Sequence, residues 1–218
     1  MIYVASRIGL HHEVSEDSIL IGSHVLTDTA EVLCMPKSGF VCVADGVGGN
    51  QGGAQASQYV LEALAEAENT NVESLRELLV KTNNTLIKKA KEDEVASRMA
   101  TTLTGIFVQE GAFHLIHVGN TRAFVKQGRY FKQITSDHTT YNWLKSIGQI
   151  EAAEACNKNE ITNCLGGADP ALLSKLVVSD IPPFSLMVLT SDGVHEYVDL
   201  DTLENILIAE GTYRDKCE

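Results

Sequence analysis

The spacing of hydrophobic residues changes twice along the chain and divides it into three regions. The first region contains short apolar runs that are typical of β-strands. These runs are residues 2–6, 18–22 and 39–44. Apolar residues then recur every three or four positions, which predicts two amphipathic helices, one over residues 56–67 and one over residues 75–90. Asn71 is the expected N-cap of the second helix, after a break at residues 69–71.

From residue 101 onward the period of the pattern returns to two, which predicts a meander of antiparallel strands joined by glycine-containing turns. The expected strands are residues 102–108, 113–118, 123–125 and 130–134. After them we expect a helix at 139–147, strands at 173–178 and 185–190, and a closing helix at 200–208. Strands, then two helices, then many strands indicate an α+β fold in which helices lie outside one or two sheets.

Length and composition narrow the class of protein without identifying it. The 218 residues are 44% hydrophobic and 21% charged, which is typical of a globular protein. No stretch has the composition of a linker, so we expect a single domain over residues 1–218. The net charge of −12 argues against nucleic acid or an anionic membrane as the main partner, and it permits divalent cations. No apolar run approaches the roughly 18 residues that cross a bilayer.

The cysteines indicate a reducing compartment. They are odd in number and form no C-x-x-C pair, so neither a disulfide framework nor a zinc site is expected. The five are Cys34, Cys42, Cys156, Cys164 and Cys217. The first residues also lack a basic region followed by a long apolar stretch, so we expect no signal peptide and a cytoplasmic location.

Two apolar strands are each followed by Asp-Gly, at Asp45-Gly46 and at Asp192-Gly193. An aspartate at the end of a buried strand is desolvated unless a ligand compensates its charge, and the glycine allows a sharp turn that brings a carbonyl oxygen near. Two such ends side by side would offer the oxygen ligands that Mg²⁺ and Mn²⁺ prefer, and the pair Glu16-Asp17 could complete the cluster. Asp-Gly is also a common turn dipeptide, so plain turns are the alternative.

Other candidate features point less clearly to chemistry. The glycine run at residues 46–53 is neither G-x-G-x-x-G nor a Walker loop. His11 and His12 are adjacent, so on a strand they would face opposite sides and could hardly bind one ion. We expect His138 to be a loop residue, and His195 could line the Asp192 site. The motifs of serine or cysteine nucleophiles are absent from the sequence.

Seven short motifs follow one another in an order that is specific, although each is weak alone. They are Ser15-Glu16-Asp17, residues 43–49, residues 99–103, residues 118–122, residues 134–139, Leu165-Gly166 and residues 189–193. In these motifs, from about residue 6 to residue 204, the chain resembles the metal-dependent type 2C Ser/Thr protein phosphatases, bacterial branch.

The resemblance implies a fold and a metal site. The fold would be an α/β/β/α sandwich, in which two packed antiparallel sheets are flanked by helix pairs. Two Mg²⁺ or Mn²⁺ ions would lie at one end of it. Asp45 would bridge both ions, the Gly46 carbonyl would bind one and Asp192 the other, while Glu16 and Asp17 would hold metal-bound waters.

The resemblance also implies an activity. Water activated by the two ions would hydrolyse phosphoserine and phosphothreonine in proteins, in opposition to a Ser/Thr kinase, and no protein nucleophile would be needed. Residues 141–163 would form a flap beside the active site.

The chain departs from the family pattern at three places. His12 stands where many members carry the arginine that binds substrate phosphate, so we count it among the candidate catalytic residues. Asn120 replaces the aspartate of the third metal site, which puts a third ion in doubt. The closing Asp-Asn motif is absent, so we expect the last helix and strand of the fold to be missing. The alternative function is therefore a catalytically impaired relative that binds a phosphoprotein or a regulatory partner.

Overall fold

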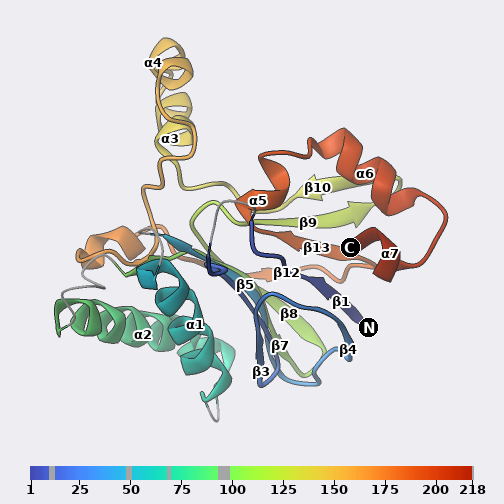
Figure 1. The fold of residues 1–218 in the computed structure, drawn as a ribbon, viewed down its shortest axis with the longest axis horizontal. Helices are drawn as coiled ribbons and strands as arrows, with labels where there is room; N and C mark the ends of the chain where they lie inside the picture. The colour runs from blue at the N-terminus through green and yellow to red at the C-terminus, as the bar shows by residue number, and fades with distance from the viewer. Residues whose placement is uncertain (10–12, 48–50, 68–69, 93–98, 218) are drawn as a thin grey trace.

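An antiparallel sheet of eight strands forms the centre of the fold (Figure 1). The computed structural model describes residues 1–9, 13–47, 51–67, 70–92 and 99–217. Along the sheet the strands follow the order β11-β6-β5-β7-β8-β12, and β2 pairs with β5 and β3. The strands are β2 Asp17–Ile21, β3 His24–Leu26, β5 Gly39–Val47, β6 Ala100–Thr101, β7 Leu103–Gln109, β8 Ala112–Val118, β11 Leu165–Gly166 and β12 Val177–Ile181.

A second layer of strands packs on one face of this sheet and consists of two separate antiparallel sheets. One is the pair β1 Ile2–Ala5 and β4 Ala30–Leu33. The other has the order β10-β9-β13, with β9 Arg122–Gln127, β10 Tyr130–Gln133 and β13 Met187–Thr190. The expected pair of stacked antiparallel layers is confirmed, but the second layer is divided between two sheets.

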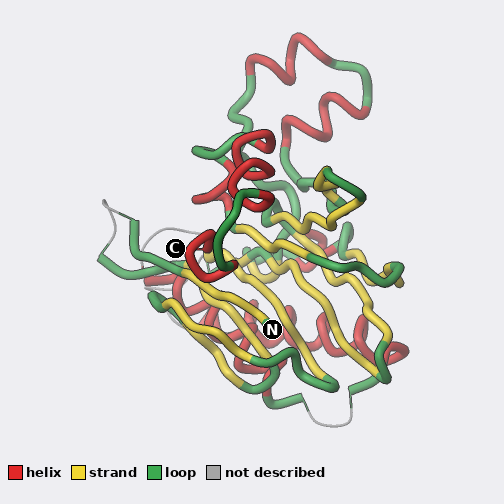
Figure 2. Tube along the Cα trace, turned by 90° about the vertical axis from the view of Figure 1, so that its right-hand side faces the viewer, coloured by secondary structure: helices red, strands yellow, loops and turns green. Residues whose placement is uncertain are grey.

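Helices cover both outer faces and one hairpin stands apart (Figures 1 and 2). The long helices α1 Gln51–Ala65 and α2 Val72–Glu92 pack on the eight-stranded sheet. On the other side α6 Leu200–Ile208 packs beside β10, and α7 Tyr213–Cys217 contacts β1. Helices α3 Thr140–Ser146 and α4 Ile150–Ala155 form a hairpin that projects from the body, and α5 Asp192–His195 follows β13.

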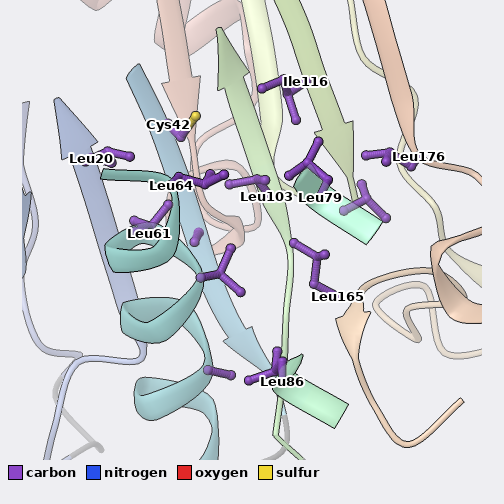
Figure 3. Close-up of a cluster of buried hydrophobic side chains, with 14 of the residues drawn as sticks. Leu20, Cys42, Leu61, Leu64, Leu79, Leu86, Leu103, Ile116, Leu165 and Leu176 are labelled. Carbon is purple, nitrogen blue, oxygen red and sulfur yellow. The ribbon is translucent and has the colours of Figure 1, made fainter. Parts of the chain in front are cut away.

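The alternating pattern of β5 explains why the layers stack on both of its faces. Phe40 and Cys42 are buried among the side chains of α1 and α2, whereas Val41 between them is buried against the second layer. Figure 3 shows the larger core, in which Leu61 and Leu79 of the two helices meet the sheet. Each face of the strand therefore buries apolar area, which is the main favourable contribution to folding.

Most elements lie where the pattern predicts them, and Asn71 caps α2 by accepting a hydrogen bond from the Ser74 N–H at 3.0 Å. The prediction of a strand at residues 173–178 is wrong in its start. Pro170 opens a 3₁₀ turn, Pro170–Leu173, which the Asp169 side chain caps, and β12 begins only at Val177. The hairpin's second helix, α4, and the closing α7 were not expected.

None of the helices in the described ranges combines the length and the apolar character that a membrane crossing requires.

Substitutions of Leu79 and of its neighbour Val80 on α2 test which face of this helix packs in the core. Leu79 is fully buried, whereas the Val80 side chain is 42% exposed. We expect Leu79→Ala to lower the free energy of unfolding by about 2–5 kcal/mol, because it leaves a cavity among well-packed side chains. Val80→Ala should change it by less than about 1 kcal/mol, since alanine favours the helix. Urea titration followed by circular dichroism measures both, and equal effects would contradict the assignment of this helix face.

Candidate active site

The pairing of β2 with β5 places two aspartates side by side. In this antiparallel register Asp17 is directly opposite Asp45. Residues directly opposite each other point to the same face, with Cβ atoms about 4.5–5.5 Å apart. The preceding residue, Glu16, accepts a hydrogen bond through its backbone oxygen from the Gly46 N–H at 3.1 Å. The start of β2 and the end of β5 are therefore joined at the point where the acidic residues gather.

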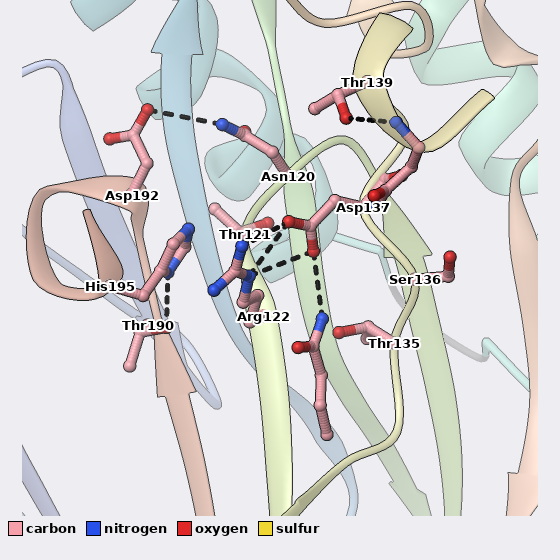
Figure 4. A network of polar contacts seen from close by, with 12 residues as sticks. Asn120, Thr121, Arg122, Thr135, Ser136, Asp137, Thr139, Thr190, Asp192 and His195 are labelled. Carbon is pink, nitrogen blue, oxygen red and sulfur yellow. Dashed lines mark hydrogen bonds and ion pairs between the residues drawn. The ribbon is translucent and has the colours of Figure 1, made fainter. Parts of the chain in front are cut away.

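Asp192 reaches the same point from the second layer, at the junction of β13 and α5. The neighbouring Ser191 hydroxyl donates to Asp17 Oδ2 at 2.7 Å. From the turn between β8 and β9, the Asn120 side chain donates through Nδ2 to Asp192 Oδ2 at 3.3 Å (Figure 4). Asp17 at the start of β2, Asp45 near the end of β5 and Asp192 just after β13 are thus brought together. The hydrogen bonds that hold them join residues distant in sequence.

The backbone of Asp45 is held by two threonines of the β6–β7 segment. The Asp45 N–H donates to Thr102 Oγ1 at 3.0 Å, and the Asp45 carbonyl accepts from the Thr102 N–H at 2.9 Å. Thr101 Oγ1 also donates to that carbonyl at 2.9 Å. The strand does not end at Asp45, as the sequence suggested, because β5 continues to Val47 and pairs with β6. The carboxylate therefore projects from a regular, fixed strand.

Gly46 is required for a reason other than the sharp turn we expected. A Cβ atom on Gly46 would lie 2.2 Å from the backbone carbon and oxygen of Gly53 at the start of α1. A Cβ on Gly53 would in turn lie 2.5 Å from Glu16 Oε1. Both glycines permit the backbone of β5 and that of α1 to touch beside the acidic residues. Gly193 does not form the expected sharp turn either, because it lies within helix α5.

Burial and mutual repulsion strongly disfavour full ionisation of the aspartates. The pKa of Asp45 is raised from 3.8 to about 9, first by burial and then by the charges of Asp17 and Asp192, with a smaller contribution from Glu16. Burial also raises the pKa of Asp17, and the Asp192 charge adds to this, while the Ser191 hydroxyl opposes it. These carboxyl groups must therefore take up protons or be neutralised by a cation.

Two buried oxygen atoms at this place support the second possibility. Asp45 Oδ2 and Asn120 Oδ1 have no hydrogen-bond partner among the described residues. Both are hard oxygen donors of the kind that Mg²⁺ and Mn²⁺ bind. Within the ranges that the structure describes, no three His, Cys, Asp or Glu side chains converge closely enough to hold an ion alone. The residues thus fit a cation whose shell is completed by backbone oxygen and water.

A pocket of about 770 Å³ lies between the body and the α3–α4 hairpin, and it is connected to the acidic cluster through Asn120, which donates to Asp192; the three aspartates themselves do not line it. It is lined by Asn120, Arg122, Tyr141, Lys158, His195 and Tyr197, among others. Arg122 forms a bidentate ion pair with the buried Asp137, donating through Nη2 to Oδ2 at 2.6 Å and through Nε to Oδ1 at 3.1 Å (Figure 4). The pKa of His195 is lowered to about 4 by burial and by the Arg122 charge, so its ring is neutral at pH 7.

Of the candidate site residues, the structure brings Asp17, Asp45 and Asp192 together, with Glu16 and Gly46 beside them. His11 and His12, including the candidate phosphate contact, lie outside the described residues. His195 lines the pocket, as its position after Asp192 suggested. Sequence reasoning did not select Ser191 as a site residue, although its position directly before Asp192 is a signal that could have identified it.

Comparison with known proteins gives one consistent result. A family model described as protein phosphatase 2C matches residues 25–209. The serine/threonine phosphatase stp of Listeria monocytogenes is 28% identical over 193 residues, which cover 82% of this chain and 75% of that protein. The protein phosphatase PhpP of Streptococcus pneumoniae is also 28% identical, over 82% of this chain and 76% of its own length.

Solved structures agree with the sequence comparisons. The serine/threonine phosphatase Stp1 from Staphylococcus aureus superposes with a TM-score of 0.75 at 26% identity, over 100% of this chain and 89% of that one. A structure described as a bacterial serine phosphatase gives a TM-score of 0.77 at 29% identity, over 95% of this chain and 84% of the other.

The crowding of the aspartates predicts that Asp45→Asn stabilises the protein when divalent cations are removed with a chelator. The amide keeps the shape and, unlike the carboxyl group with its raised pKa, takes up no proton on folding, so the free energy of unfolding should rise by roughly 0.5–2 kcal/mol. Asp201→Asn changes an exposed carboxylate on α6 and should have an effect within about 0.5 kcal/mol. Urea titration at pH 7.5 measures both, and a destabilised Asp45→Asn protein would contradict the repulsion.

The raised pKa of Asp45 also makes the free energy of unfolding depend on pH, and the direction of this dependence follows from the shift. Asp45 has a pKa of 3.8 in the absence of perturbation and about 9 in the fold, so between these values the folded protein keeps a proton that the unfolded chain has lost. The contribution of Asp45 to the free energy of unfolding is complete below about pH 4 and is lost as the pH rises through about 9. Asp45→Asn should remove this part of the decline.

Proposed function

Because the chain belongs to the protein phosphatase 2C family, we propose that it hydrolyses phosphoserine and phosphothreonine in proteins at the Asp17–Asp45–Asp192 cluster. The observation that carries this proposal is the gathering of three aspartates beside two buried oxygens without partners among the described residues. The names of the relatives, which are Ser/Thr phosphatases, support the same activity.

The family is in general metal-dependent, and the donor set of this chain suits two Mg²⁺ or Mn²⁺ ions. We propose that Asp45, Asp192 and the Gly46 carbonyl hold these ions directly and that Glu16 and Asp17 hold their waters. Such ions, when bound, activate water and neutralise charge on a phosphoryl group. Asn120 offers an uncharged amide oxygen, which weakens the case for a third ion.

The surrounding residues orient these groups. The Ser191 hydroxyl fixes the rotamer of Asp17, and the Asn120 amide does the same for Asp192. Thr101 and Thr102 hold the Asp45 backbone, so the carboxylate does not need to reorganise during the reaction. In this chain catalysis rests on positioning and charge, which is what phosphoryl transfer requires.

A protein substrate is consistent with the pocket beside the cluster. Its volume of about 770 Å³ exceeds what a single phosphorylated side chain needs, and its walls carry both charged and aromatic groups. We propose that polypeptide flanking the phosphorylated residue lies there. The phosphoprotein would be the product of a Ser/Thr kinase.

The five cysteines form no disulfide, which supports a cytoplasmic location.

The catalytically impaired alternative draws no support from the comparisons, because the quoted relatives are named as phosphatases. It rests on the three departures from the family pattern, of which Asn120 is described by the structure and His12 lies outside the described residues. Activity measurements separate the two functions.

We expect manganese-dependent hydrolysis of p-nitrophenyl phosphate and of a phosphothreonine peptide by the wild-type protein. Asp45→Asn and Asp192→Asn should each lower kcat/KM by more than about 100-fold, the upper end of what loss of an outer hydrogen-bond partner costs a metal site. The exposed Asp201→Asn serves as the control and should retain activity. A folded wild-type protein that shows no turnover above the metal-free blank would refute the enzymatic proposal.

A further inference from the structure

Two histidines outside the acidic cluster, one buried and one half-buried, face each other and have no part in the chemistry proposed above. His117 lies on β8 and is 1% exposed, and His138 lies in the loop between β10 and α3. Their ring centroids are 4.7 Å apart and the rings are tilted by 43°. Burial lowers the pKa of both residues, that of His138 to about 4, so the rings are neutral at pH 7 and act as fixed hydrogen-bonding groups.

His117 ties the central sheet to the loop that leads into the hairpin. Its Nε2 lies 2.9 Å from the Ser136 carbonyl oxygen, which can only accept, so Nε2 carries the proton. Its Nδ1 lies 2.8 Å from Thr104 Oγ1 on β7, and that hydroxyl is 2.6 Å from Thr121 Oγ1. The His117 ring therefore links β8 to β7 directly and, through Thr104, to the turn after β8. Its other nitrogen links these elements to Ser136, just before the hairpin.

His138 makes a reciprocal pair of hydrogen bonds with Gly119. Its backbone N–H donates to the Gly119 carbonyl at 2.8 Å, and its Nδ1 accepts from the Gly119 N–H at 3.1 Å. Only glycine fits at position 119, because the residue has a φ of +109° and a Cβ there would lie 2.5 Å from the Thr102 side chain. The next residue, Asn120, donates to Asp192. The loop is thus anchored on the turn that serves the acidic cluster.

The same residue also holds the far leg of the hairpin. The His138 carbonyl accepts from the Thr162 N–H at 2.8 Å, and the neighbouring Thr139 and Ile161 form a β-bridge. Both legs of the α3–α4 hairpin (residues 139–162) therefore meet at His138. The hairpin stands away from the body in both views, and of its helical side chains only Leu144 and Ala153 are buried (Figures 1 and 2). Its orientation must then depend largely on the contacts at its base.

We propose that His138 is a positioning residue that fixes the α3–α4 hairpin, and with it one wall of the pocket, relative to the Asn120 turn. The wall in question carries Tyr141 and Asn142, and the opposite wall carries Arg122 and His195. The activity part of this inference rests on the proposed function, whereas its structural part does not. Because the hairpin wall would contact polypeptide, its position matters for a phosphopeptide and much less for a small aryl phosphate.

Fluorescence tests the structural part without any turnover. Trp143 is the single tryptophan of the sequence, it lies on α3, and 55% of it is exposed. His138→Ala removes the acceptor for the Gly119 N–H, so we expect lower fluorescence anisotropy of Trp143 and stronger quenching by acrylamide. His138→Asn keeps an oxygen near the place of Nδ1 and should restore both values.

Kinetics test the consequence for substrates. For a phosphothreonine peptide, His138→Ala should lower kcat/KM by up to about a hundredfold, mainly through KM, because a misplacement of about 1 Å can cost that much in rate. The kcat for p-nitrophenyl phosphate should change much less, and His138→Asn should recover most of the loss. His114→Ala is the control, because His114 is buried on β8 like His117 but pairs with Asp180 and not with residues at the base of the hairpin. It should affect neither Trp143 nor the ratio of the two substrates.

The outcomes are decisive in each direction. A folded His138→Ala protein with unchanged Trp143 quenching, or a His138→Asn protein as impaired as the alanine variant, overturns the proposal. If the alanine variant does not fold, His138→Gln replaces it, since glutamine fills the space but moves the acceptor by one bond. If the wild-type protein hydrolyses neither substrate, the proposed function fails, and a quenching change that asparagine reverses still upholds the positioning role.

Discussion

The structure is organised around the register of β2 and β5, which sets Asp17 directly opposite Asp45. Placing like charges together in a buried position is unfavourable, and every neighbouring feature serves to hold that arrangement. Ser191 and Asn120 bind the carboxylates, two threonines bind the Asp45 backbone, and the Gly46–Gly53 contact brings α1 close. The apolar cores on both faces of β5 supply the stability that makes this local cost tolerable.

The body of the fold supplies the acidic cluster, and the α3–α4 hairpin supplies one wall of the adjoining pocket. Regular strands position the aspartates, and rigid elements do this more accurately than loops. The hairpin contributes a lightly packed wall on one side of the pocket. Between them lies a short polar segment, residues 136–138. Its Ser136 carbonyl is bound by His117, and its His138 side chain accepts from the Gly119 N–H. The body and the hairpin are thereby joined through a small number of hydrogen bonds.

Much of this could be predicted from local patterns, because alternating residues such as Phe40, Val41 and Cys42 report burial on two faces. The order of the seven motifs indicated the family and the acidic residues. What local patterns could not supply was pairing across the chain. The extension of β5 past Asp45 depends on β6, and the need for glycine at position 46 depends on α1. His138 resembled an ordinary loop residue because its partner Gly119 is distant in sequence.

The hydrogen bond between Ser191 and Asp17 joins residues 174 positions apart. Contacts of such separation form late in folding, since the entropy of closing a long loop must be lost before the contact contributes. Because Asp17 and Asp45 pair within the central sheet, their repulsion is present as soon as that sheet forms. The charge of Asp192 joins them only when the second layer packs on the sheet, so the cluster is completed by a contact between the two ends of the chain.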